Sequence, residues 1–112
     1  MSPVEPPIPP DLLRKYVAYA RGINPVLTSE AMERLKEFYM EMRSASESEG
    51  SPIAITARQL ESLVRIAEAR ARAALRDRVL LEDAEHAIAI MRRSLEEAGI
   101  DISSHKIDID II

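Results

Sequence analysis

The sequence predicts an all-α protein, a small bundle of four helices with an extended proline-rich arm before it and an extended tail after it. Three observations support this fold class. Ala, Leu, Ile, Glu and Arg dominate the 112 residues, aromatic residues make up only 4%, and tryptophan is absent; this composition favours helices over a β-sandwich or barrel. Apolar residues recur at helical spacing in four segments. Five of the seven prolines fall within the first ten residues, where they remove backbone donors and oppose helix formation.

The chain divides into a proline-rich arm over residues 1–10, a helical domain over residues 11–100 and an extended tail or linker over residues 101–112. Its length suits one domain with a single core and excludes a multidomain enzyme. No apolar run approaches the roughly 18 residues that a membrane span requires, and the N-terminus lacks the basic start and apolar centre of a signal peptide. We therefore expect a soluble, intracellular and cytoplasmic protein that makes no membrane contact.

The first two helices are set by capping residues and apolar stripes. Asp11 is the predicted N-cap of the first helix, which ends at Gly22 before Pro25. The apolar positions of this helix are Leu13, Tyr16, Val17 and Ala20. Thr28 is the predicted N-cap of the second helix, which runs to about Ser46. The apolar stripe of the second helix consists of Ala31, Leu35, Phe38, Tyr39 and Met42.

The third helix is the longest and most periodic segment. A loop rich in serine and glutamate over residues 44–51 precedes it, and Ile53 and Ile55 form a brief extended entry. The helix opens at Thr56 and yields to a turn around residues 77–81. Its predicted core stripe is Leu60, Val64, Ala67, Ala71 and Ala74, widened by Leu63 and Leu75.

The fourth helix is predicted from about Glu82 to Gly99, and its start is the weakest of the four by sequence pattern. Its inward positions are Ala84, Ala87, Ile88, Met91 and Leu95. Leu81 stands where a capping serine or threonine is expected, so Asp83 or the backbone must satisfy the free N–H groups there. Residues 106–111 alternate apolar and charged side chains, which suits a short strand or an extended linker.

Several classes of catalytic site are excluded by composition. The absence of cysteine removes disulfides, thiolate catalysis and cysteine-based metal sites, and two isolated histidines, His86 and His105, offer no metal site. The three glycines lie far apart, so no loop can wrap a phosphate chain in backbone N–H groups. A net charge of −4 does not attract nucleic acid to the chain as a whole.

Arg58 is the candidate functional residue, because it occupies a position that local electrostatics disfavour. Thr56 and Gln59 fit the capping box, in which each side chain accepts from a backbone N–H of the other, and they fix the start of the third helix. Arg58 then lies at the second helical position, near the positive end of the helix dipole. Free N–H groups and a guanidinium at that end could together bind a phosphate group.

A second interpretation of the same face needs no ligand. Glu61 and Arg65 are spaced as an i,i+4 ion pair, as are Glu68 and Arg72, and Glu61 can also reach back to Arg58. Surface ion pairs of this kind are common and contribute little stability. The charge pattern by itself leaves both interpretations open.

The sequence also contains two longer runs of charged residues. Each run could be a solvent-exposed helix face or a surface that binds a partner. The basic run comprises Arg58, Arg65, Arg70, Arg72, Arg76 and Arg78, and could contact a phosphate backbone or an acidic neighbour. The acidic run from Thr28 to Gly50 comprises Glu30, Glu33, Glu37, Glu41, Glu47 and Glu49, and could dock the basic helix of another subunit or be neutralised within the chain.

Three segments of the sequence resemble one protein family. These are LLRKYVAYAR at residues 12–21, LKEFY at residues 35–39 and, above all, ITARQLE at residues 55–61 followed by RIAEA at residues 65–69. They resemble the helical lid that closes the AAA+ ATPase domain of the MCM replicative helicases, in particular the archaeal members. The resemblance runs from about Pro10 to the C-terminus.

The resemblance implies a function for Arg58. In that family the matching arginine is sensor 2, which contacts the γ-phosphate of ATP bound by the adjacent subunit of a hexameric ring, and Thr56 and Gln59 would hold the helix start that aims it. ATP and Mg²⁺ would be bound in the assembled helicase and not by the isolated chain. The implied partners are the remainder of an MCM-type ATPase and the neighbouring subunits, with DNA reached indirectly and a chromosome-associated location.

The family motifs that precede the lid, including Walker A, Walker B, sensor 1 and the arginine finger, are missing from this sequence. The chain alone is therefore expected to be monomeric and not to hydrolyse ATP. Two alternative functions remain open at this point. One is a stand-alone helical adaptor that binds a replication ATPase, and the other is a histone-fold-like DNA-binding dimer, against which the net charge of −4 argues.

Overall fold

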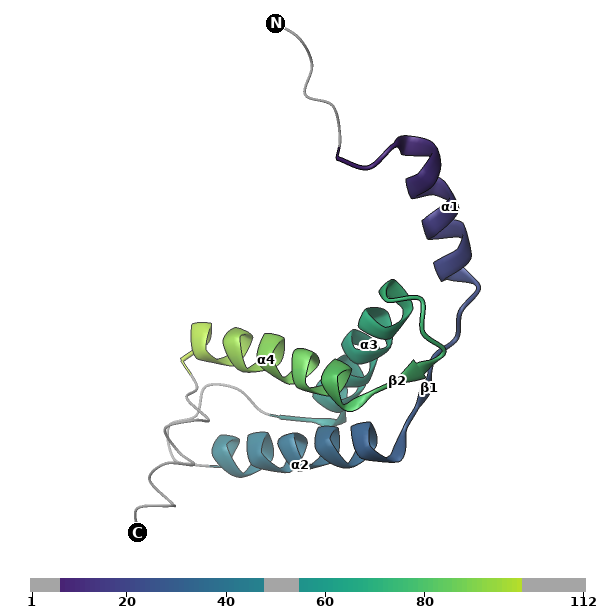
Figure 1. Cartoon of the computed structure of the whole chain (residues 1–112). Coiled ribbons are helices and arrows are strands. Elements are labelled where there is room, and N and C mark those ends of the chain that lie inside the picture. The colour runs from purple at the N-terminus through teal and green to yellow at the C-terminus, as the bar shows by residue number, and fades with distance from the viewer. Residues whose placement is uncertain (1–6, 48–54, 100–112) are drawn as a thin grey trace, which may run out of the picture.

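The computed structural model describes residues 7–47 and 55–99 and confirms the helical fold class. In order along the described chain, the elements are α1 (Pro10–Arg21), β1 (Val26–Leu27), α2 (Ser29–Ser46), α3 (Ala57–Ala73), β2 (Arg78–Val79) and α4 (Leu81–Glu97). Helices α2, α3 and α4 pack together into a body, and α1 projects from it (Figure 1). The expected arm before residue 7, the loop from residue 48, the extended entry at Ile53 and the tail from residue 101 lie outside the described residues.

The core lies between the three helices of the body. Its fully buried large side chains are Leu35, Phe38, Met42, Leu63, Val79 and Ile88. The predicted stripes of α2 and α4 are confirmed, with Tyr39 and Met91 partly buried at their edges. In α3 the predicted positions Leu63, Ala67 and Ala71 are buried and Leu60 and Val64 are partly buried. The prediction is wrong for Ala74 and Leu75, which are exposed because the helix ends at Ala73. Small alanines at the buried positions allow the backbones of neighbouring helices to approach closely.

The start of α1 differs from the sequence prediction. The helix begins at Pro10 with Pro9 as N-cap, and no side chain caps it, so the predicted cap at Asp11 is wrong. Pro10 suits this first helical position because its φ is already helical and its missing N–H would have no intrahelical partner. Asp11 lies in the first turn and pairs with Arg14 at 3.3 Å. The predicted end of the helix at Gly22 is confirmed.

Helix α3 ends at Ala73, several residues before the turn that the sequence predicts. Leu75 adopts a left-handed conformation with φ of 58°, the Leu75 N–H donates to the Arg72 carbonyl, and the Arg76 N–H donates to the Ala71 carbonyl, each at 2.9 Å. These two bonds form the Schellman motif, which satisfies the last carbonyls of a helix. This helix end could not be predicted from the sequence, because the usual residue at the left-handed position is glycine and this chain has Leu75 there.

The structure contains two short strands that the sequence did not predict. β1 lies between α1 and α2, and β2 lies between α3 and α4. β1 and β2 pair in parallel, with Val26 opposite Arg78 and Leu27 opposite Val79. The Thr28 hydroxyl joins this pair to α2, since it accepts from the Ala31 N–H at 3.3 Å as the predicted N-cap and donates to the Val79 carbonyl at 2.6 Å. Strands this short give no sequence signal, because their pairing depends on where the helices place them.

Asp83 is the one buried charged residue among those that the structure describes, with no exposed surface. Its carboxylate accepts from Arg70 Nη1 at 2.8 Å, from both Nη atoms of Arg76 at 2.5 and 2.8 Å, and from the Leu80 N–H at 2.8 Å. The last of these bonds confirms that Asp83 helps to satisfy the start of α4. Burial by itself raises the pKa of Asp83, but the bonds from Arg76, Leu80 and Arg70 outweigh it and lower the pKa to about 2.

Replacing Asp83→Asn is expected to destabilise the domain by roughly 2 to 4 kcal/mol, because both arginines lose the charged acceptor that the buried carboxylate provides. Urea unfolding followed by circular dichroism measures the change. The matched control is Glu82→Gln, whose carboxylate lies 3.2 Å from Arg76 Nη2 but is 60% exposed; it should cost less than about 0.5 kcal/mol. Equal effects of the two substitutions would contradict the importance assigned to the buried carboxylate.

Stability is also expected to fall in acid. The pKa of Asp83 is lowered from 3.8 to about 2 in the folded chain. Above pH 3.8 the ionised carboxylate therefore contributes about 2 kcal/mol to the free energy of unfolding, and this contribution is lost as the pH falls from 3.8 to about 2. The difference in unfolding free energy between the parent chain and Asp83→Asn should therefore shrink between pH 5 and about pH 2. A difference that stays constant over this interval would contradict the assignment.

Candidate functional site

The start of α3 has the local structure that the sequence predicts. Thr56 is the N-cap, with φ of −121° and ψ of 177°, and the reciprocal capping box with Gln59 is present. The Gln59 Oε1 atom accepts from the Thr56 N–H at 2.8 Å and from the Thr56 hydroxyl at 3.1 Å, while the Thr56 hydroxyl accepts from the Arg58 N–H at 3.3 Å. Arg58 is thereby fixed as the second residue of the helix.

The Arg58 side chain is exposed and has neither an ion pair nor a side-chain hydrogen bond with any residue in the described ranges. A salt-bridged face would need ion pairs between neighbouring side chains of α3. None of the expected pairs has its charged atoms within 4.0 Å, namely Arg58 with Glu61, Glu61 with Arg65 and Glu68 with Arg72. An unpaired guanidinium at the positive end of a helix has no local stabilisation. The described residues therefore do not form the salt-bridged face, and the anion-binding interpretation of Arg58 stays a prediction.

The structure divides the basic run into structural and exposed arginines. Arg70 and Arg76 bind the buried Asp83 carboxylate, and the Arg72 Nε atom donates to the Ile23 carbonyl at 2.9 Å, which holds the segment after α1 against α3. Arg58 and Arg65 remain exposed. The run is thus not one continuous basic surface, and only part of it is available to an anionic partner.

Asp83 and its two arginines are the ionic cluster that sequence reasoning missed. The sequence shows Asp83 beside the inward positions of the fourth helix, which is a signal of burial, but its partners lie 7 and 13 residues away. The cluster is structural, since Asp83 is enclosed and has no open surface for a ligand. No group of three or more His, Asp or Glu side chains within the described segments could hold a metal ion.

The arrangement at the start of α3 suits the binding of an anion that another molecule presents. The first turn of the helix offers backbone N–H groups and the positive end of the dipole, and Arg58 adds a planar, forked guanidinium donor. Within residues 7–47 and 55–99, no helix is long and apolar enough to cross a membrane.

Comparisons with known proteins show which family the chain resembles. The pattern of the MCM AAA-lid domain matches residues 11–95. The minichromosome maintenance protein MCM of Saccharolobus solfataricus is 56% identical over 104 residues, which cover 91% of this chain and 15% of that protein. DNA helicase MCM8 of Rattus norvegicus is 52% identical over 90 residues, which cover 80% of this chain and 11% of that protein. This chain therefore spans a small fraction of the length of these relatives.

A solved structure supports the same relationship at the level of the fold. The full-length MCM homologue from Methanopyrus kandleri superposes with a TM-score of 0.70 and 41% sequence identity, over 77% of this chain and 20% of that one. The three body helices of the present structure have nearly equal lengths of 18, 17 and 17 residues. These findings favour a lid-like fold over the histone-fold-like alternative, which would need one long central helix.

The capping box predicts a clear ranking of substitutions at the start of α3. Thr56→Ala should lower the unfolding free energy by about 1 kcal/mol, because it removes an N-cap acceptor. Arg58→Ala should change it by less than about 0.5 kcal/mol, since the side chain is exposed and unpaired. Thermal and urea unfolding of the two variants test the ranking, and a larger loss in Arg58→Ala than in Thr56→Ala would show that Arg58 is a structural residue.

Proposed function

The chain belongs to the MCM family, whose AAA-lid domain it carries, and we propose that it acts as the lid module of an ATP-dependent replicative DNA helicase. In this proposal the module supplies a sensor 2 arginine, Arg58, to ATP held at a subunit interface of a hexameric ring. Its partners are the remainder of an MCM-type ATPase and the neighbouring subunits, and it reaches DNA only through the assembly.

The single observation that carries the proposal is the placement of Arg58. Its guanidinium is exposed at the second position of α3, and no partner for it exists within the described chain. A cation at this end of a helix is electrostatically unfavourable by itself, so an incoming phosphate would relieve a local conflict as well as gain a charge-assisted hydrogen bond. This supports a role for Arg58 in which the anion comes from outside the chain.

The contribution of Arg58 to hydrolysis would be electrostatic. During phosphoryl transfer, negative charge is spread over the oxygens of the transferred group, and a forked donor that is held in place stabilises that charge. ATP and Mg²⁺ would be held by the remainder of the ATPase. Thr56 and Gln59 would act as positioning residues, because their capping box determines where the helix begins and hence where Arg58 projects.

The body of the lid would carry this arginine as a rigid unit. α3 packs against α2 and α4, and the Asp83 cluster locks its C-terminal end to the start of α4. A shift of the lid relative to a neighbouring subunit would therefore move Arg58 without rearranging the core. This is how closure of a lid can complete a catalytic constellation.

In a ring that contains the rest of the ATPase, Arg58→Ala is expected to lower the rate of ATP hydrolysis roughly 100-fold, the usual effect of removing one transition-state donor. Arg58→Lys should recover only part of the rate, because an ammonium retains the charge but not the fork. Steady-state hydrolysis by the assembled ring measures both effects. The matched control is Arg65→Ala, which removes an exposed arginine two turns further along the same helix.

Three outcomes would count against the proposal. If Arg58→Ala and Arg65→Ala lowered hydrolysis equally, the effect would belong to general charge. If Arg58→Ala unfolded the domain, its role would be structural. If the 112-residue chain, added to a ring whose subunits retain their own lids, bound it tightly as a separate protein, the stand-alone adaptor would be the better description.

A further inference from the structure

Helix α1 presents an apolar face that no part of the described chain covers. Of its predicted apolar positions only Ala20 is buried, whereas Leu13, Tyr16 and Val17 are exposed by 46%, 37% and 38% and Leu12 by 57%. The body holds α1 at one end, through a hydrogen bond from the Tyr16 hydroxyl to the Ala73 carbonyl and the bond from Arg72 to Ile23. The rest of the helix projects into solvent (Figure 1).

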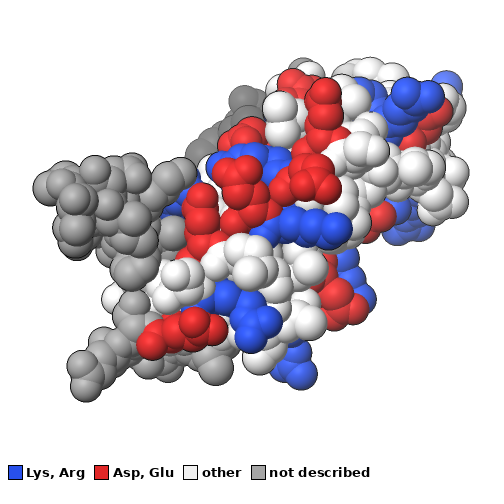
Figure 2. All heavy atoms as spheres, turned by 90° about the horizontal axis from the view of Figure 1, so that it is seen from below, with Lys and Arg blue, Asp and Glu red and all other residues white. Residues whose placement is uncertain are grey.

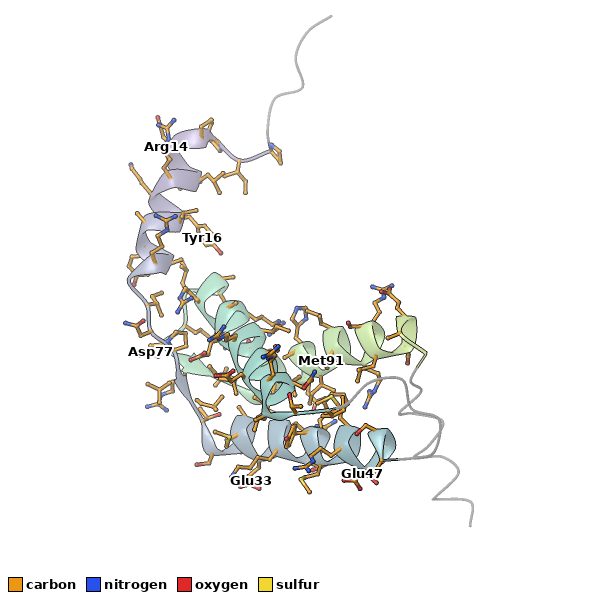
Figure 3. All side chains as sticks on the ribbon, turned by 180° about the vertical axis from the view of Figure 1, so that it is seen from behind. Arg14, Tyr16, Glu33, Glu47, Asp77 and Met91 are labelled. Carbon is orange, nitrogen blue, oxygen red and sulfur yellow. The ribbon has the colours of Figure 1, made fainter. Side chains whose placement is uncertain are left out.

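This apolar face is flanked by positive charge. Leu13, Arg14, Val17, Ala18 and Arg21 together line a shallow hollow along α1. Arg14 points away from the body (Figure 3) and pairs at 3.3 Å with the exposed Asp11 of the same helix, and Lys15 adds a further exposed cation beside it. A surface that complements this face of α1 would therefore have an apolar centre and an acidic margin.

A surface with that character lies on the body of the same chain. A groove between α2 and the start of α4 is lined by Ser29, Glu30, Glu33, Arg34, Glu37 and Leu81. Leu81 is 42% exposed, and Met40, one turn beyond the groove on α2, is 62% exposed. The lining carries three glutamates and one arginine, and that arginine is already paired with Glu85 at 2.5 Å and with Glu37 at 3.4 Å.

Part of the acidic face of α2 is not neutralised by the residues that the structure describes. Glu30 and Glu33 form no ion pair with any described residue, Glu33 points away from the body (Figure 3), and Figure 2 shows acidic side chains gathered on the face seen from below, where α2 lies nearest. Within the acidic run, Glu37 is neutralised by Arg34, whereas Glu30 and Glu33 are the two side chains at which this arrangement favours the docking of a basic helix.

The dimensions of the two surfaces also correspond. The hollow on α1 extends from Leu13 to Arg21, and the groove on α2 extends from Ser29 to Glu37. Each interval is eight residues of helix, or about 12 Å. The helix cannot reach the groove of its own chain while Tyr16 and Arg72 hold it beside the C-terminal end of α3, so the matching groove must come from another molecule.

We propose that α1 of one copy of this chain docks, with its basic margin, into the acidic groove between α2 and α4 of a second copy. The contact is head to tail, because one molecule contributes α1 and the other contributes α2 and α4, so the pair as a whole retains one free α1 face and one free groove. The proposed contact between copies does not involve Arg58, so it is independent of the proposed nucleotide contact. Since the surfaces are small, the association of the free chains should be weak.

Sedimentation equilibrium of the 112-residue chain at low salt tests the proposal. The weight-average mass should equal the monomer mass of 12.5 kDa at low micromolar concentration, and should rise above it toward about 1 mM, with a dissociation constant of about 100 µM. Added salt should weaken the association, because part of the attraction is between exposed charges. A chain that remains monomeric at about 1 mM in low salt would overturn the proposal.

Charge reversal on each surface identifies the contact. The double substitution Arg14→Glu with Lys15→Glu on α1, and the double substitution Glu30→Lys with Glu33→Lys on α2, should each weaken self-association at least tenfold. An equimolar mixture of the two variants should associate again, because each supplies the surface that complements the other. Circular dichroism checks that both variants remain folded, and Glu47→Lys, at the far end of α2 outside the groove, is the control that should change nothing.

Two patterns would show that a different contact is present. If the α1 variant lost association but the α2 variant did not, the dimer would be symmetric through α1 alone. If neither double substitution had an effect, the association would use a surface outside both helices. A mixture that stays monomeric although both variants are folded would also overturn the head-to-tail arrangement.

Discussion

The buried Asp83 carboxylate is the constraint on which the arrangement of the body depends. Three parts of the chain meet there, namely the last turn of α3 through Arg70, the segment leading into β2 through Arg76, and the start of α4 through the Leu80 N–H. Arg76 can reach this site because the left-handed conformation of Leu75 ends α3 and turns the chain back. A buried carboxylate without these donors would be strongly unfavourable, so the angle between α3 and α4 is tied to the completeness of this cluster.

The two ends of α3 therefore serve different purposes. At its C-terminal end, arginines bind a carboxylate and a backbone carbonyl within the chain. At its N-terminal end, Arg58 has no partner among the described residues, although the capping box beneath it is complete. Departures from local preference that persist on a well-formed helix tend to mark functional sites, and here the departure falls within the segment that most resembles the MCM lid.

The unsatisfied surfaces of the chain follow from its relation to larger proteins. The relatives are several times longer than the matched region, and a lid that works within an assembly must present faces that are completed by other parts of it. The apolar side of α1 is such a face, since several of its apolar side chains are exposed, and so is the part of α2 around Glu30 and Glu33, which form no ion pair with a described residue. The core, by contrast, is formed within the described chain by α2, α3, α4 and β2, together with Ile55 before α3 and Leu27 of β1 at its edge.

The sequence by itself determined the features that depend on residues close together in the chain. The Thr56–Gln59 box, the Thr28 cap, the apolar stripes of α2 and α4 and the position of Arg58 all rest on spacings of three or four residues, which a helix converts directly into contact. Only the tertiary structure decided the pairing of β1 with β2, the early end of α3, the exposure of α1 and the two arginines that hold Asp83. Each of these depends on where separate helices lie relative to one another, and that placement results from the packing of the whole core rather than from any local pattern of residues.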